Sequence, residues 1–220
     1  GACGVNEQLF YLDYFYFRSN KSKQVIYILS PPLFFSESLP IASNTFDFET
    51  FEFSFLARYL VFPSENKAER IFSYLQNKNS KEWLNYYPSS LERKAEELTG
   101  IDSTAIEEGQ NLAYQNSSEF NMIRFRKSAK RIEETIELAR KHHSEVILII
   151  PPTLFGKWRG HEKVARFGLK MANKSGVQFY DLSESVLIPN YYYDHHHLNT
   201  KGIEYFTEKF LRPILTNGKN

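Results

Sequence analysis

The sequence predicts an α/β protein organised around a parallel β-sheet. Three short apolar runs, rich in β-branched and aromatic residues, are typical of buried strands: Gln24–Ser30, Glu145–Ile150 and Val177–Leu182. Helical patterns lie between and after these runs, and strands that alternate with helices form parallel sheets. A chain of 220 residues with 42% hydrophobic residues is long enough for one such core. We therefore expect a single domain over residues 1–220.

Prolines mark the ends of the first two strands. Pro31 and Pro32 follow the first run, and Pro151 and Pro152 follow the second. Proline lacks the amide hydrogen that a central strand donates to its neighbour. Both strands are therefore expected to end at these prolines.

Three later segments have the periodicity of amphipathic helices, with apolar residues three or four positions apart. Their apolar stripes run over Phe125–Ala139, Val164–Met171 and Ile203–Phe210. Asn199 or Thr200 precedes the last stripe, and either side chain can cap a helix start. We expect these helices to pack against the sheet.

The middle of the chain is less regular. Residues 34–62 are rich in aromatic side chains, and their pattern fits both strand and helix templates. We favour a helix from about Phe51 onward. Residues 76–115 are polar and are typical of helical pieces joined by exposed loops. We expect this stretch to be an insertion over one face of the domain, such as a lid.

Composition limits the classes of partner. The formal net charge is only +1, and lysine and arginine are spread along the chain, so we expect no nucleic-acid partner. No run reaches the roughly 18 apolar residues that a membrane-spanning helix needs. The single cysteine excludes an internal disulfide and a cysteine-rich zinc site.

The stretch YYYDHHHLNTKG, residues 191–202, contains three consecutive histidines. On an extended chain His195 and His197 would share a side and His196 would not, and zinc would need further ligands, so we expect no metal site and no cofactor. A polar loop without function is a second interpretation. The third is an acid–base pair, because Asp194 lies three residues before His197 and can orient its ring toward a nucleophile.

The block DHHHLNTKG, residues 194–202, resembles the last sequence block of the SGNH (GDSL-type) hydrolase superfamily. There a D-x-x-H element supplies two members of a serine triad on a flavodoxin-like, three-layer α/β/α fold. Three further stretches are similar to blocks of the DltD-like branch, which takes part in D-alanylation of teichoic acids: VIYILSPPLFF, SSEFN and VILIIPPTLFGKW. They occur in the family's order. The resemblance implies that fold, with the first strand outside the sequence given.

The resemblance also implies an activity, an acyl-ester hydrolase or acyltransferase that acts on a cell-envelope polymer or a carrier-bound acyl group. His197 would be the general base, Asp194 its orienting carboxylate, and the Gly4 amide in GACGVNEQL a donor of the oxyanion hole. The implied partners are an acylated polysaccharide, a teichoic-acid-like polymer or an acyl carrier. The implied location is extracytoplasmic, in the periplasm or at the cell surface, with a membrane anchor upstream of this sequence.

Two features depart from the family pattern. The block with the nucleophilic serine should precede Gly4, so we expect either a longer protein or a remnant that binds without catalysis. Pro32 stands where the family has an oxyanion-hole asparagine or glutamine, and loss of one such donor costs on the order of 3 kcal/mol of transition-state stabilisation. The alternative function is therefore a catalytically inactive SGNH-like module that binds an envelope glycan or an assembly partner.

Asn121, Lys157 and Trp158 are the candidate substrate-binding residues. Asn121 or Lys157 could replace the missing donor. Lys157 and Trp158 belong to GKWRG, which follows the carboxyl end of a strand, where open parallel sheets bind ligands; Arg159 could join Lys157 in meeting an anionic polymer. A solvated loop anchored by its tryptophan fits the same pattern. Cys3 has three interpretations: a small packed residue, a nucleophile or a lipidated cysteine.

Overall fold

The computed structural model describes residues 4–35, 52–61, 67–77, 96–114 and 121–217. The chain divides into two compact units, each assembled from separate stretches of sequence. The first comprises Gly1–Val25, Ser36–Tyr87 and Met122–Glu145, and the second Ile26–Phe35, Pro88–Asn121 and Val146–Asn220. Our expectation of one domain stays a prediction. Within the described ranges, no helix has both the length and the apolar character needed to cross a membrane.

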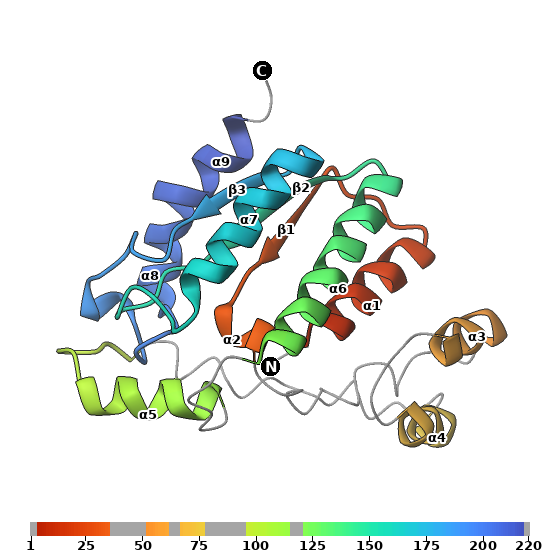
Figure 1. Cartoon of the computed structure of the whole chain (residues 1–220), viewed down its shortest axis with the longest axis horizontal. Coiled ribbons are helices and arrows are strands. Elements are labelled where there is room, and N and C mark those ends of the chain that lie inside the picture. Colours follow the sequence, from red (N-terminus) through yellow and green to blue (C-terminus); the bar gives the residue numbers. More distant parts are fainter. Residues whose placement is uncertain (1–3, 36–51, 62–66, 78–95, 115–120, 218–220) are drawn as a thin grey trace. The chain divides into compact units, whose positions relative to one another are not determined.

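A three-stranded sheet in the order β1-β2-β3 is the centre of the α/β architecture (Figure 1). The strands are β1 (Gln24–Ile28), β2 (Glu145–Ile150) and β3 (Gln178–Asp181). β2 and β3 pair in parallel, with Ile147 opposite Gln178. On the other side of β2, the N–H of Leu29 donates to the carbonyl of Ile149 over 2.8 Å. The predicted α/β class with a parallel sheet is confirmed, and β1 and β2 end before their proline pairs.

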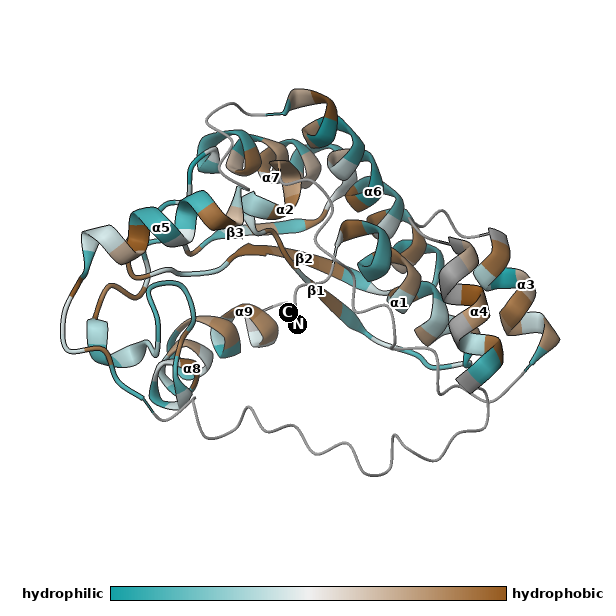
Figure 2. Ribbon diagram, turned by 90° about the horizontal axis from the view of Figure 1, so that it is seen from below, coloured by the Kyte–Doolittle hydropathy of each residue, from teal (hydrophilic) through white to brown (hydrophobic). Residues whose placement is uncertain are grey.

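β2 is buried along almost its whole length. Residues Val146 to Ile150 are each at most 6% exposed, and Figure 2 colours the strand as hydrophobic. A central strand that is covered on both faces needs consecutive apolar residues rather than alternating ones. The run EVILII meets that requirement. In β1, by contrast, Ile26 and Ile28 are 39% and 43% exposed.

Helices cover both faces of the sheet within the second unit. On one face, Ile147 and Ile149 pack with Ile214 of α9 (Arg212–Asn217). On the other, α7 (His161–Ser175) comes so close to β3 that a Cβ on Gly168 would lie 2.3 Å from the ring of Phe179. Glycine permits this close approach because it has no side chain. The short helix α2 (Pro31–Phe35) also contacts α7.

The C-terminal helical segment begins where the sequence predicts. Asn199 caps α8 (Thr200–Phe206), and a π-helical turn (Thr207–Leu211) leads into α9. Phe206 is buried, but Ile203 is 46% exposed. The predicted stripe fails at Ile203 because the buried face of α8 runs through Gly202 and Phe206, which are four residues apart, and Ile203 lies beside that face.

The first unit is helical. It contains α1 (Val5–Phe17), α3 (Phe53–Val61), α4 (Lys67–Asn77) and α6 (Met122–Lys141), and α1 packs against α6. The helices predicted over residues 125–139 and from Phe51 onward are confirmed. An aromatic cluster joins α1, α3 and α4, and its buried residues are Phe10, Phe55, Tyr59 and Tyr74.

The predicted insertion over residues 76–115 is described at its two ends. Residues 78–95 lie outside the described ranges. The later end forms α5 (Ser103–Ala113), and its N-cap Asp102 accepts hydrogen bonds from the amides of Thr104 and Ala105 over 2.9 and 3.1 Å. α5 has no buried residue of its own. One face of it is half-buried, including Ile106 and Ala113.

Candidate active site

The three histidines lie in a closed loop before α8, after the 3-10 turn η3 (Pro189–Tyr191). An antiparallel bridge joins Tyr192 to Leu198, and the N–H of Tyr193 donates to the carbonyl of His197 over 3.2 Å. The N–H of Leu154, shortly after β2, donates to the carbonyl of His195 over 3.1 Å. These bonds hold the histidine loop, residues 192–198, next to the segment that follows β2.

Asn199 fastens the base of the histidine loop. Asn199 is only 1% exposed, and its side-chain Nδ2 donates to the carbonyls of Asn190 and Glu96 over 2.8 and 3.1 Å. Its Oδ1 accepts from the N–H of Gly202 over 2.9 Å. A Cβ on Gly202 would lie 2.1 Å from the carbonyl oxygen of Tyr191. Asn199 and Gly202 therefore position the loop rather than supply chemistry.

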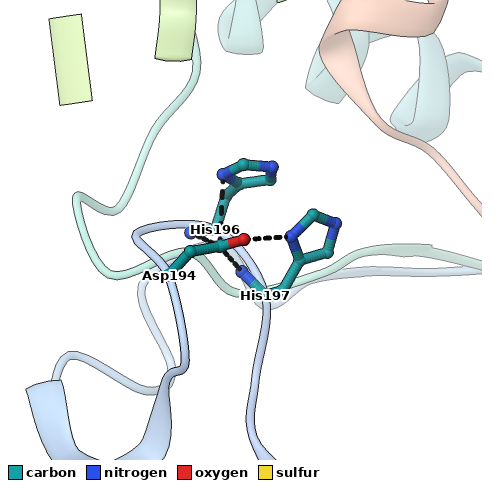
Figure 3. Close-up of side chains that lie close together, drawn as sticks. All are labelled: Asp194, His196 and His197. Atoms are coloured by element: carbon teal, nitrogen blue, oxygen red, sulfur yellow. Dashed lines mark hydrogen bonds and ion pairs between the residues drawn. The ribbon is translucent and has the colours of Figure 1, made fainter. Parts of the chain in front are cut away.

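Asp194 and His197 make the contact that the sequence predicts (Figure 3). Oδ2 of Asp194 lies 2.7 Å from Nδ1 of His197, while Oδ1 accepts the backbone N–H groups of His196 and His197 over 2.9 and 2.8 Å. Burial of Asp194 opposes its ionisation, but the bonds from His197 and the His196 amide, with the charges of both rings, outweigh burial and lower its pKa to about 2. Asp194 is thus an oriented carboxylate near neutral pH.

The other ring nitrogen of His197, Nε2, belongs to an exposed side chain. The side chain is 54% exposed, and no described residue hydrogen-bonds to Nε2. Tyr193 stacks on the ring, with centroids 5.4 Å apart and planes at 4°. The ring is therefore held by Asp194 and Tyr193 while one nitrogen stays open. Among the described residues, no hydroxyl or thiol contacts that nitrogen.

His196 lies against Asp194 as well. Its Nδ1 is 3.3 Å from Oδ1 of Asp194, and its ring centroid is 4.0 Å from that of His197. Burial, helped by the charges of His197 and His195, lowers the pKa of His196 against the opposing effect of Asp194. An extended chain would place His195, not His196, on the side of His197. That expectation is wrong because the loop turns here instead of extending.

His195 is directed to α5. Its Nε2 accepts the backbone N–H of Asp102 over 3.1 Å. Asp102 is the N-cap of α5, so this bond ties the first turn of α5 to the histidine loop.

The predicted substrate-binding residues differ in their relation to the loop. Trp158 meets the ring of His196 edge to face, with centroids 5.6 Å apart at 72°. The Lys157 ammonium lies 2.7 Å from the Glu184 carboxylate, which raises the pKa of Lys157. Asn121, the residue before α6, is exposed. Only Trp158 is seen beside the histidines, and substrate binding by all three stays a prediction.

Arg159 holds the far end of α5. Its guanidinium donates to Gln110 and Asn111 over 3.1 and 2.6 Å and lies over the ring of Tyr114, whose hydroxyl donates to the Arg159 carbonyl. The guanidinium of Arg159, which we expected to meet an anionic polymer, is therefore bonded to α5 in the structure. No spacing in the sequence indicates these contacts, because Arg159 is almost fifty positions from its partners.

Gly4 belongs to the first unit and the histidine loop to the second. The N–H of Gly4 donates to the carboxylate of the buried Glu7 over 3.1 Å, at the start of α1. The oxyanion-hole role of Gly4 stays a prediction, and Cys3 lies outside the described residues. Pro32 is a buried residue of α2.

His161 is a buried histidine that the sequence analysis did not select. Its Nε2 lies 2.9 Å from Oδ2 of Asp181 and 3.3 Å from Oγ of Ser183. Both partners meet the same nitrogen, so this group cannot relay a proton from the serine to the aspartate. It joins the start of α7 to the end of β3.

One group of potential metal ligands is present among the described residues. Asp194, His196 and His197 each offer one ligand atom, and these atoms lie within 4.8 Å of one another. No other described group of histidine, cysteine or carboxylate side chains converges in this way.

Comparison with known proteins adds no family to this picture. No protein-family model matches the chain, and no curated protein or solved structure matches it significantly. The function therefore has to be argued from the α/β fold and from the geometry of the histidine loop.

Proposed function

We propose that the protein is an SGNH-type serine hydrolase or acyltransferase in which His197 is the general base. The observation that carries this proposal is the 2.7 Å contact of Asp194 Oδ2 with His197 Nδ1, combined with the exposed side chain that carries Nε2. A carboxylate on one ring nitrogen fixes the tautomer and stabilises the imidazolium, while the other nitrogen is available to a hydroxyl.

The sheet supports the flavodoxin-like assignment. Its three strands are neighbours in chain order, as are the last three strands of the flavodoxin-like order 2-1-3-4-5. The histidine loop is bonded to Leu154, in the segment beyond the carboxyl end of β2. Open α/β sheets bind ligands beyond the carboxyl ends of their strands.

In the proposed reaction, a serine oxygen attacks the acyl carbonyl and His197 Nε2 accepts the serine proton. In this proposal the Gly4 amide, which donates to Glu7 in the structure, would have to turn from that carboxylate to the oxyanion of the tetrahedral intermediate. His197 then returns the proton to the leaving oxygen or sulfur, and an acyl-enzyme remains. Water or a sugar hydroxyl attacks that ester and gives its proton to His197, and His197 passes the proton to the departing serine oxygen as the acyl group leaves on the acceptor. The family resemblance assigns the serine to a block that precedes Gly4.

The proposed substrate is an acylated cell-envelope polymer, such as a teichoic-acid-like chain, or an acyl carrier outside the cytoplasm. Trp158 offers a flat apolar surface beside His196, and Lys157 and Asn121 offer polar groups. The proposed reaction requires no cofactor.

A serine-directed fluorophosphonate probe and a chromogenic acetyl ester test the proposal on the protein purified from the cells that make it. We expect covalent labelling and a burst of product equal to one acyl group per chain. His197→Ala should abolish the burst. His143→Asn is the matched control: His143 is exposed with φ 61°, a conformation that asparagine tolerates. Labelling of a serine whose reactivity is the same in His197→Ala would contradict the proposal.

The second candidate function is binding without catalysis. Two observations favour it: Pro32 has no amide to donate, and no described hydroxyl contacts Nε2 of His197. In that case the probe would label no serine, while isothermal titration would still detect an envelope glycan. Trp158→Ala should then weaken glycan binding.

A further inference from the structure

We propose that Asp194, His196 and His197 bind one divalent transition-metal ion, a function of the histidine loop that does not depend on a serine nucleophile. In Figure 3 the rings of His196 and His197 both approach the carboxylate of Asp194, with Nδ1 to oxygen distances of 3.3 and 2.7 Å. Ligand atoms around a tetrahedral zinc ion lie roughly 3.3–3.6 Å apart, given bonds of about 2.0–2.2 Å. The two nitrogens meet different oxygens of the carboxylate, and one ligand atom from each of the three residues lies within 4.8 Å of the other two, so the donors have to draw together to share an ion.

The two rings are held before an ion arrives. Trp158 packs against His196, with ring centroids 5.6 Å apart, and Tyr193 stacks on His197. Two backbone amides fix Oδ1 of Asp194. Groups that are already ordered lose little conformational entropy on binding, so this loop resembles a preorganised ligand set.

The donor types select the class of ion. Two imidazole nitrogens and one carboxylate oxygen suit zinc, copper, nickel or cobalt, whereas calcium and magnesium prefer oxygen ligands. Three protein ligands leave at least one coordination position for water or another small ligand. Zinc is the ion on which the test is based.

The loop conformation explains why the sequence predicts no metal site. That prediction assumed an extended chain, on which His196 points away from His197. In the structure, the turn after Asp194 brings those two rings to the same carboxylate. His195 stays outside the set because its Nε2 accepts the amide of Asp102.

A bound ion would compete with the acid–base pair. The ion takes Oδ of Asp194 and Nδ1 of His197, the two atoms whose contact orients the ring. Zinc should therefore inhibit acyl transfer, and this consequence alone rests on the proposed function. Zinc binding itself is tested separately, by direct titration.

Isothermal titration of the tag-free whole protein with zinc chloride tests the site, with magnesium chloride as the reference. We expect one zinc ion per chain and no heat of binding from magnesium. Asp194→Asn and His196→Ala should each weaken zinc binding by more than the roughly 10–100-fold that loss of an outer-shell partner costs. His195→Asn is the matched control, because it removes a neighbouring histidine and leaves the three ligands, and it should bind zinc like the unmodified protein.

Absence of zinc binding, or equal affinity in His196→Ala, would overturn the proposal. Circular dichroism checks that each variant is folded. If His196→Ala does not fold, cobalt titration of the unmodified protein followed by NMR decides the matter. Cobalt should broaden the ring signals of His196 and His197 before those of the exposed His142 and His143. Earlier broadening of His142 or His143 would also overturn the site.

Discussion

Asp102 donates its backbone N–H to Nε2 of His195 over 3.1 Å, and this bond joins α5 to the histidine loop. At the other end of α5, Gln110 and Asn111 accept hydrogen bonds from Arg159. α5 has no fully buried residue, so these end contacts add to what its half-buried face contributes to its position. The described part of the predicted insertion thus bridges the histidine loop and the segment GKWRG.

We predict that His195→Ala loosens the start of α5. The variant removes the acceptor of the Asp102 amide, and one such hydrogen bond contributes about 1 kcal/mol, roughly a fivefold change in the opening equilibrium. Hydrogen exchange of the amides in residues 102–106 should accelerate by that factor. His195→Gln has a longer side chain that brings an amide acceptor close to the position of Nε2, and its amides should exchange more slowly than those of His195→Ala. Unchanged exchange in His195→Ala would show that the bond does not hold α5.

We predict that Asn199→Ala destabilises the second unit by about 2–3 kcal/mol, because it removes a helix cap and leaves buried carbonyl groups without donors. Urea unfolding followed by tryptophan fluorescence measures the loss. Asn199→Ser retains an acceptor for the Gly202 amide but loses the side-chain amide donors. Its stability should therefore lie between that of Asn199→Ala and that of the unmodified protein. A fully stable alanine variant would show that water satisfies these groups.

We predict that Gly202→Ala destabilises the protein by about 1–3 kcal/mol, the range for overpacking. The added Cβ would meet the Tyr191 carbonyl at 2.1 Å, and a backbone atom has little freedom to move away. Gly100→Ala is the control, since a Cβ there meets nothing within 4 Å. Equal melting temperatures for the two variants would contradict the prediction.

Asp181 gives a pH-dependent contribution to stability. Burial raises its pKa, but hydrogen bonds from Ser183 and His161 and the charge of His161 outweigh burial, so the folded-state pKa is lowered. A lowered pKa stabilises the fold above the unfolded value of about 3.9, and the contribution disappears as pH falls through the folded value. Asp181→Asn should therefore be less stable than the unmodified protein at pH 6. The difference should shrink below about pH 4 in urea unfolding; a constant difference would contradict it.

Local patterns predicted the three strands and the helices α3, α6, α7 and α8 but not α2 or α4. The run EVILII and the stripe over residues 125–139 carry their own periodicity, so β2 and α6 follow from sequence alone. α1 was not predicted, because aromatic residues line much of it and favour strands as readily as helices. Its position depends on a tertiary contact, the 2.7 Å hydrogen bond of Tyr16 with Ser144.

In the candidate site, too, contacts between near neighbours in the sequence could be predicted and contacts between distant residues could not. The Asp194–His197 contact spans three positions, so the spacing alone predicts it. The contact of Trp158 with His196 and the bond of Asp102 with His195 join residues far apart in the chain. Such contacts depend on how loops meet at the sheet, for which a single sequence has no pattern.

We predict that Asp194→Asn lowers the rate constant of acyl transfer by roughly 10⁴-fold, as the equivalent change does in other serine triads. Asparagine fits the same space, and its Oδ1 can still accept the two backbone amides. Its amide nitrogen, however, would donate to Nδ1 of His197, which moves the ring proton to Nε2 and removes the base. Stopped-flow acylation with the chromogenic ester measures the rate, and Asp181→Asn is the matched control for the loss of a carboxylate. An Asp194→Asn rate within tenfold of the unmodified protein would mean that Asp194 does not set the tautomer of His197.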